Sequence, residues 1–126
     1  MNNISLTLKA FKRAPSQDSS TWYMGSLMTF LAECKDKDTN GSFALSEYNA
    51  KAGNEPPLHV HEREDELYYV LEGEIDAFVG DEVFRLKTGE SLFLPKGKPH
   101  SSLFVLPIFG RSSYSYLAEW KDTFAP

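Results

Sequence analysis

The chain has 126 residues, 41% of them hydrophobic, and a formal net charge of −5. This size suits one domain over residues 1–126 with a core of its own, and the single cysteine, Cys34, excludes an internal disulfide. The acidic balance argues against nucleic-acid binding, which usually needs a basic excess. Without a signal-like apolar leader or a run approaching the roughly 18 apolar residues of a membrane helix, we expect a cytoplasmic protein that makes no membrane contact.

Short apolar runs separated by turn signals fill the chain after an N-terminal arm of roughly residues 1–20, which has room for one short strand. The runs are rich in Phe, Tyr, Val and Leu, as strands are. They cover residues 27–34, 42–49, 67–71, 75–79, 83–86, 91–94 and 101–106. This spacing predicts an all-β sandwich or barrel. Asn40-Gly41, between the first two runs, predicts a hairpin turn, because its central residues need positive φ.

The tail after Gly110 leaves two alternatives open. Residues 111–120 begin by alternating polar and apolar side chains, which indicates a last strand, but residues 116–124 are equally compatible with a helical turn. We also expect the aromatic residues Trp22, Phe93 and Phe104 to lie in the core, with pocket walls as the second alternative.

Two of the three histidines, His59 and His61, are separated by a single residue. On a strand, side chains two positions apart point to the same face, with Cα atoms roughly 6.5 Å apart. Both imidazoles could then converge on one ion. A carboxylate from the acidic cluster that follows could add a third ligand, and the turn "PKGKP" could deliver His100 from another strand.

Three imidazoles and one carboxylate form a mixed nitrogen and oxygen shell. Such a shell suits one divalent first-row transition ion (Fe, Mn, Ni, Co, Cu or Zn) better than Mg or Ca. The residues alone do not decide which carboxylate of Glu62, Glu64, Asp65 and Glu66 would bind, and an acidic cluster is by default a solvated loop.

The glycines around these histidines reveal a resemblance. The spacing Gly53, five residues, His59, Val60, His61, four residues, Glu66, six residues, Gly73 is similar to the first cupin motif, G-x5-H-x-H-x4-E-x6-G. The positions Gly89, Pro95, Gly97 and His100 are similar to the second motif, G-x5-P-x-G-x2-H-x3-N, whose final Asn is Phe104 here. The motif core thus covers residues 53–104.

Membership of the cupins would imply a double-stranded β-helix, or jelly-roll barrel, with a metal held by His59, His61, Glu66 and His100. The departure at Phe104 touches no ligand of that set. The wider sequence, including residues 22–25 ("WYMG"), is similar to small bacterial cupins described as quercetin-dioxygenase-like. The resemblance further implies a small-molecule substrate or ligand, and related small cupins usually form homodimers.

Glu66 shares strand parity with Tyr68 and Val70, so these three side chains are expected beside the metal. Leu67, Tyr69 and Leu71 would face the other way and, being apolar, would be covered by a second sheet or by a partner subunit. Glu66 could then serve as ligand and as general base.

Three functions remain open on this basis: an oxygen-using metalloenzyme acting on a chelating substrate, a metal-dependent isomerase, lyase or hydrolase, and a non-catalytic module that binds a metal or a small molecule. The first is the function we expect.

Overall fold

The computed structural model describes residues 8–23, 26–34, 38–50, 53–105 and 112–120. These residues form nine strands and no helix. The described part of the chain therefore has no helix that could cross a membrane. The strands are β1 (Ser20–Tyr23), β2 (Ser26–Ala32), β3 (Phe43–Ala50), β4 (Glu64–Glu72), β5 (Glu74–Val79), β6 (Glu82–Lys87), β7 (Ser91–Leu94), β8 (His100–Val105) and β9 (Ser112–Trp120).

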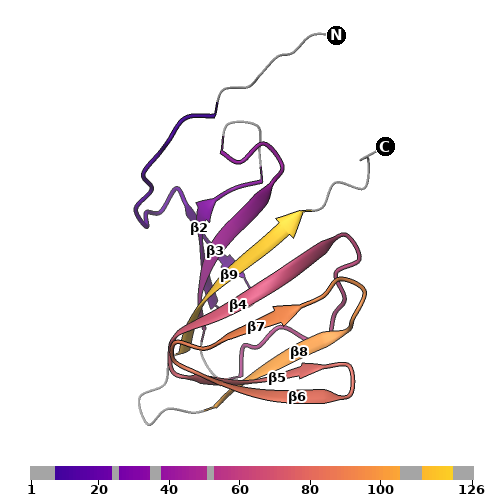
Figure 1. Ribbon diagram of the computed structural model, residues 1–126. Helices are drawn as coiled ribbons and strands as arrows, with labels where there is room; N and C mark the ends of the chain where they lie inside the picture. The colour runs from indigo at the N-terminus through magenta and orange to yellow at the C-terminus, as the bar shows by residue number, and fades with distance from the viewer. Residues whose placement is uncertain (1–7, 24–25, 35–37, 51–52, 106–111, 121–126) are drawn as a thin grey trace, which may run out of the picture.

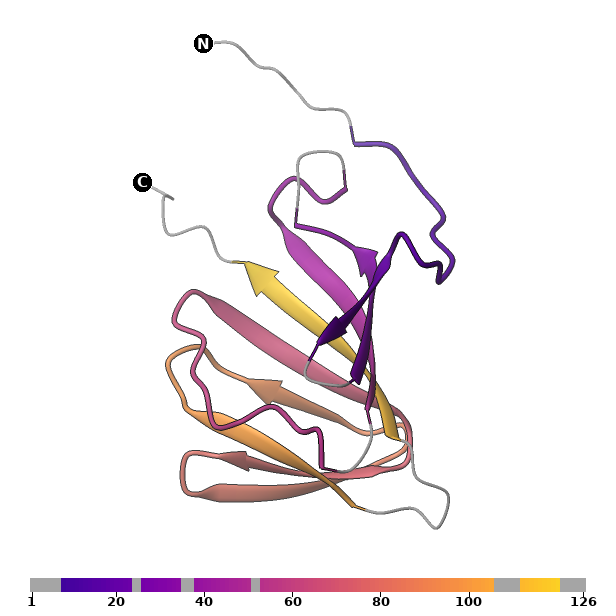
Figure 2. The same cartoon turned by 180° about the vertical axis from the view of Figure 1, so that it is seen from behind.

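The strands form two facing sheets, as Figures 1 and 2 show from opposite sides. The larger sheet has the order β1-β2-β3-β9-β4-β7, and the smaller one has the order β6-β5-β8. All pairings within the two sheets are antiparallel. The last strand, β9, lies between β3 and β4, so the first and last described strands belong to the same sheet. The all-β jelly-roll prediction is confirmed.

The strand runs predicted from the sequence each correspond to an observed strand. The run 91–94 matches β7 at both ends. The ends of the other runs lie within three residues of the ends of their strands. Residue 106, the predicted end of the last run, lies outside the described residues. The turn between β2 and β3 has positive φ at Asn40 (52°) and Gly41 (82°), as the hairpin prediction required. Of the two alternatives for the tail, the strand is correct, since β9 pairs with both neighbours.

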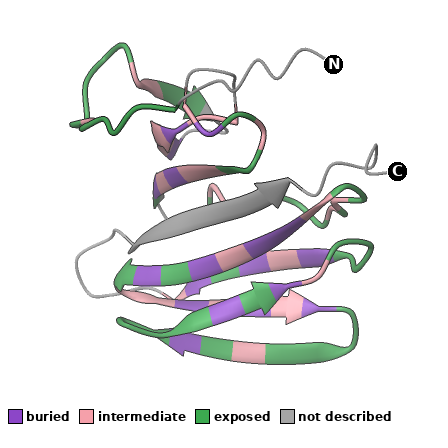
Figure 3. Cartoon of the chain, turned by 45° about the horizontal axis from the view of Figure 1, so that its top comes forward, coloured by how far each residue is buried: buried purple, intermediate pink, exposed green. Residues whose placement is uncertain are grey.

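The core lies between the inward faces of the two sheets, where Figure 3 shows buried stretches alternating with exposed ones along the strands. Alternation follows from the period of two in a strand, which sends neighbouring side chains to opposite faces. The buried apolar cluster comprises Tyr48, Tyr68, Val70, Ile75, Ala77, Val79, Leu86, Leu92, Leu94 and Phe104. It draws on both sheets, so the barrel is closed by packing of apolar side chains.

The two faces of β4 differ sharply. Glu66, Tyr68 and Val70 are at most 4% exposed, as their parity predicted, whereas Tyr69 is 45% and Leu71 39% exposed. Leu67 is half-buried. Among the described residues no second sheet covers Tyr69 and Leu71, so of the two alternatives for the outward side chains only the partner subunit remains, as a prediction. Two core predictions are also wrong: Trp22, on the edge strand β1, is 73% exposed, and Phe93, on β7, is 57% exposed. Phe104 is buried, as predicted.

Candidate metal centre

Three of the four carboxylates that follow the histidines, Glu64, Asp65 and Glu66, lie in a strand, whereas Glu62 lies before it and is exposed, as expected for a solvated loop. The strand β4 begins at Glu64, three residues before the predicted run. Asp and Glu are depleted in strands, but here each of the three has a partner. Glu64 and Glu66 lie on the inner face beside histidines, and Asp65 accepts the backbone N–H of Lys96 at 2.9 Å. The acidic run therefore contributes to the site.

His59 and His100 lie opposite each other in a single β-bridge. The His59 N–H donates to the His100 carbonyl at 3.0 Å, and the His100 N–H donates to the His59 carbonyl at 2.8 Å. The strand geometry assumed for His59 and His61 does not form: among the described residues, only this bridge involves either of them. Two prolines, Pro56 and Pro57, precede the pair and have no N–H to donate to a ladder.

The three imidazoles nevertheless converge. Ring centroids are 4.9 Å apart for His59 and His61, 4.3 Å for His59 and His100, and 5.6 Å for His61 and His100. Ligand atoms of the three histidines all lie within 4.8 Å of one another, and so do those of His61, Glu64 and Glu66. The structure thus brings together all four residues that the cupin resemblance selects, with Glu64 added.

Each imidazole has its Nδ1 next to an oxygen that can only accept a hydrogen bond. His59 Nδ1 lies 2.6 Å from the Pro57 carbonyl, His61 Nδ1 lies 2.6 Å from Glu64 Oε1, and His100 Nδ1 lies 3.4 Å from the Lys98 carbonyl. In a neutral imidazole only one nitrogen carries a proton. For His59 and His100 these partners place that proton on Nδ1 and leave a lone pair on Nε2. His61 has a carboxylate oxygen 2.6 Å from each ring nitrogen, so it binds a metal through Nε2 when its proton is on Nδ1, toward Glu64.

The Nε2 atoms of His61 and His100 face the Glu66 carboxylate. His61 Nε2 lies 2.6 Å from Glu66 Oε1, and His100 Nε2 lies 3.3 Å from Glu66 Oε2. The His100 Nε2 atom is fully buried and makes no hydrogen bond to any described residue. Facing acceptors repel unless a proton or a cation lies between them. A proton on His61 would satisfy one contact, whereas a single divalent cation would satisfy them together, so the donor set fits the metal that the sequence predicted.

The cluster has a buried side and an open side. The side chains of Glu66 and His100 are 1% and 3% exposed, whereas that of His61 is 28% exposed and His59 is also half-buried. A buried carboxylate and imidazole give the site a water-poor floor, where electrostatic interactions are stronger. A ligand would therefore approach past His59 and His61.

The turn before β8 is fixed from two sides. Besides the bond from Lys96 to Asp65, the Gly97 N–H donates to the His61 carbonyl at 2.8 Å. Gly97 has φ of +80°, a conformation in which a side chain is strained. The three other motif glycines also have positive φ. The second motif therefore positions His100 through backbone geometry.

Sequence reasoning missed the roles of Glu64 and Asp65. Had the strand been started at Glu64, parity with Glu66 would have placed Glu64 on the inner face. The role of Asp65 had no local signal, because its partner lies 31 residues further along the chain.

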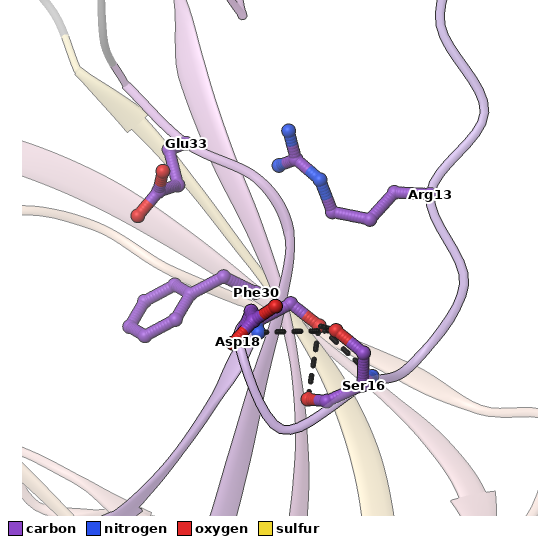
Figure 4. Close-up of a pocket in the computed structure, with 6 residues that line it drawn as sticks. Arg13, Ser16, Asp18, Phe30 and Glu33 are labelled. Atoms are coloured by element: carbon purple, nitrogen blue, oxygen red, sulfur yellow. Dashed lines mark hydrogen bonds between the residues drawn. The ribbon is translucent and has the colours of Figure 1, made fainter.

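A separate crevice of about 250 Å³ lies where the N-terminal arm passes β2 (Figure 4). It is lined by Arg13, Ser16, Asp18, Ser19, Phe30 and Glu33. The guanidinium of Arg13 is engaged by Asp38 at 2.7 Å and 3.2 Å, an ion pair that raises the pKa of Arg13. With its cation so engaged and no histidine in its lining, the crevice is a weaker candidate than the metal centre.

Comparison with known proteins agrees with this geometry. The family model described as "Cupin domain" matches residues 46–102. The chain is 40% identical over 85 residues to the uncharacterized protein YdbB of Bacillus subtilis, an alignment that covers 61% of this chain and 73% of YdbB. It is 33% identical over 57 residues to the uncharacterized protein MJ1618 of Methanocaldococcus jannaschii, and this alignment covers 45% of the chain and 46% of MJ1618.

The fold itself is found in solved structures. The structure of KdgF from a Halomonas species superposes with a TM-score of 0.66 at 20% identity, covering 85% of this chain and 94% of KdgF. Likeness at this level of identity shows the fold. Together with the matched domain and the YdbB relative, it establishes that the chain belongs to the cupin family.

Proposed function

We propose that this cupin is a metal-dependent oxygenase of the quercetin-dioxygenase-like type, which acts on a small chelating substrate. One divalent first-row transition ion would be held by His59, His61, Glu66 and His100. One observation carries the proposal: an acceptor lies at each of the three Nδ1 atoms, the ligand atoms of the three histidines converge, and the Nε2 atoms of His61 and His100 face Glu66. Imidazole and carboxylate donors together favour first-row transition ions over Mg or Ca.

When bound, such an ion would supply Lewis-acid and redox chemistry toward a substrate with neighbouring oxygen atoms. The chain's own residues divide the remaining work. His59 and His61 form the solvent side of the cluster and would border the bound substrate, while His100 and Glu66 form its buried floor. The apolar side chains behind that floor, Tyr68 and Val70, exclude water from it.

Glu66 is the residue proposed to move a proton. Its two oxygens are held unequally, with Oε1 2.6 Å from His61 Nε2 and Oε2 3.3 Å from His100 Nε2. A carboxylate that keeps one oxygen in the cluster can accept a substrate proton with the other. Deprotonation of an enol or hydroxyl group would prepare a chelating substrate for oxidation.

The proposal is tested by metal analysis and by oxygen consumption. Protein purified without added metal or chelator should contain iron, manganese or nickel. It should also consume oxygen with flavonols or other vicinal hydroxy-carbonyl compounds in an oxygen electrode. Zinc alone, with no oxygen consumed by any metal form, would refute the oxygenase and point to an isomerase, a lyase or a binding module.

A further inference from the structure

We propose that Glu64 is a positioning residue of the metal centre, whose carboxylate fixes the tautomer and the orientation of His61. The His61 Nε2 lone pair is thereby directed at the ion. This inference rests on the proposed metal site and goes beyond it, because Glu64 occupies none of the cupin motif positions and none of the four ligand positions.

The contact itself is short and shielded. Glu64 Oε1 lies 2.6 Å from His61 Nδ1, and the Glu64 side chain is only 14% exposed. A hydrogen bond to an ionised carboxylate is shorter and stronger than one between neutral groups. Because Glu64 and Glu66 share the inner face of β4, the two carboxylates lie at the opposite nitrogens of the same imidazole.

His61 needs such a partner because the other two histidines are held differently. His59 and His100 each have Nδ1 beside the carbonyl of the residue two positions earlier, Pro57 and Lys98. The equivalent carbonyl for His61 belongs to His59, and it accepts the backbone N–H of His100 at 2.8 Å. The β-bridge that joins the two cupin motifs therefore engages one lone pair of that oxygen, and the acceptor that lies at His61 Nδ1 is the Glu64 carboxylate.

Loss of this acceptor has a definite chemical consequence. With no partner at Nδ1, His61 can carry its proton on Nε2 and donate it to Glu66 Oε1, which lies 2.6 Å away. That tautomer blocks both the nitrogen and one carboxylate oxygen, so it competes with the ion. Loss of such a partner of a metal-binding histidine typically lowers metal affinity by about 10- to 100-fold.

The chain provides a matched control in Glu62. It has the same side chain as Glu64, two residues away, but it is exposed and makes no hydrogen bond or ion pair to a described residue. Glu62→Ala and Glu62→Gln therefore remove the same charge close to the site without touching His61. A purely long-range electrostatic effect on the ion would appear in both pairs of variants.

The test measures zinc affinity of the full chain by competition with a chelating dye. Glu64→Ala should weaken zinc binding by about 10- to 100-fold. Glu64→Gln should weaken it less, because the amide oxygen still accepts the Nδ1–H, and both Glu62 variants should bind as the parent does. Circular dichroism identifies any variant that fails to fold, in which case Glu64→Gln decides the outcome.

A spectroscopic readout separates positioning from general destabilisation. In the zinc-loaded, 15N-labelled parent, each ligating imidazole should show its remaining proton on Nδ1. Glu64→Ala should remove or broaden the His61 signal through exchange with water and leave those of His59 and His100 in place. Unchanged affinity and spectrum in both Glu64 variants, or equal losses in the Glu62 variants, would overturn the proposal. A parent that binds no zinc would instead refute the metal site itself and this inference with it.

Discussion

The carboxylate of Asp65 accepts the backbone N–H of Lys96 at 2.9 Å and so joins the start of β4 to the turn that leads into β8. The same turn donates a second hydrogen bond, from Gly97 to the His61 carbonyl. His61 and His100 are therefore placed by one set of contacts that needs no ion. The three carboxylates at the start of β4 have different contacts. Glu64 contacts the His61 imidazole, Asp65 accepts a hydrogen bond from the turn before β8, and Glu66 lies among the proposed metal ligands.

Replacing Asp65 with Ala should weaken both the fold and the site. The Lys96 N–H would lose its acceptor in a part-buried position, which costs about 1–3 kcal/mol of unfolding free energy. Metal affinity should fall as well, because the turn that carries His100 is held less firmly. Urea unfolding and zinc competition measure the two effects. Asp81→Ala, at an exposed position, is the control and should change neither; equal effects in both variants would contradict the role of Asp65.

Glu66→Gln should separate metal binding from turnover. The amide keeps the size of the side chain and one weak oxygen ligand but cannot accept a proton as a carboxylate does. Three histidines remain, and three protein ligands hold an ion in catalytic zinc sites. We expect the variant to retain metal at reduced affinity and to lose the turnover found for the parent. Turnover that survives unchanged would show that the base is another residue.

The hydrogen bonds of the Glu55 carboxylate should make the unfolding free energy depend on pH. Its carboxylate accepts the backbone N–H groups of Gly53 at 2.9 Å and of Phe104 at 3.2 Å. Burial raises the pKa of Glu55, but the backbone hydrogen bonds from Gly53, from Glu55 itself and from Phe104 outweigh burial, so that the pKa lies below its ordinary value of 4.5. A carboxylate with a lowered folded-state pKa stabilises the fold above its unfolded pKa, and this contribution is lost as the pH falls through the folded pKa.

Glu55→Gln should therefore lower the unfolding free energy by about 1 kcal/mol at neutral pH. The difference between the variant and the parent should shrink as the pH falls below 4.5. Urea unfolding over that range measures it. Glu72→Gln, which removes an exposed carboxylate, is the control for loss of charge, and a difference that grew on acidification would contradict the assignment.

The homodimer expected from the sequence remains a prediction. The outward side chains of Tyr69, Leu71 and Phe93 are 45%, 39% and 57% exposed, and they lie on β4 and on β7, the edge strand of the larger sheet. An apolar face beside an open edge is a liability unless it is covered. We expect a dimer in sedimentation at micromolar concentration, converted to monomer by Phe93→Asp but not by Val83→Asp on β6. A parent that is monomeric throughout would refute the prediction.

The sequence predicted the fold well because its signals are local. Alternating side chains and glycine turns located the strands, and Asn40-Gly41 located a turn. Exposure of Trp22 and Phe93 was beyond such reasoning, since an aromatic residue in a strand gives no sign of which face it occupies until the sheet is assembled. The start of β4 was missed because Asp65 and Glu66 contact Lys96 and His100, which only the folded chain brings near.

The residues of the candidate site were predictable from motif spacing, but the orientation of the histidine rings was not. The spacing selected Glu66 among neighbouring carboxylates. It carried no information about the Nδ1 partners of the histidines, because two of these partners are backbone carbonyls and the third, Glu64, resembles any other charged residue of the run. The acceptors at the three Nδ1 atoms are visible only in the folded structure.

The most direct test of the central claim is the metal content of the parent and of a variant in which both His59 and His61 are Ala. The parent, purified without added metal or chelator, should contain one equivalent of a first-row transition ion. The variant loses two of the four proposed ligands and should contain none, while its circular dichroism and unfolding stay close to those of the parent, because the apolar cluster does not include these rings. A folded variant that keeps a full equivalent, or a parent that binds no such ion when it is supplied, would contradict the assignment.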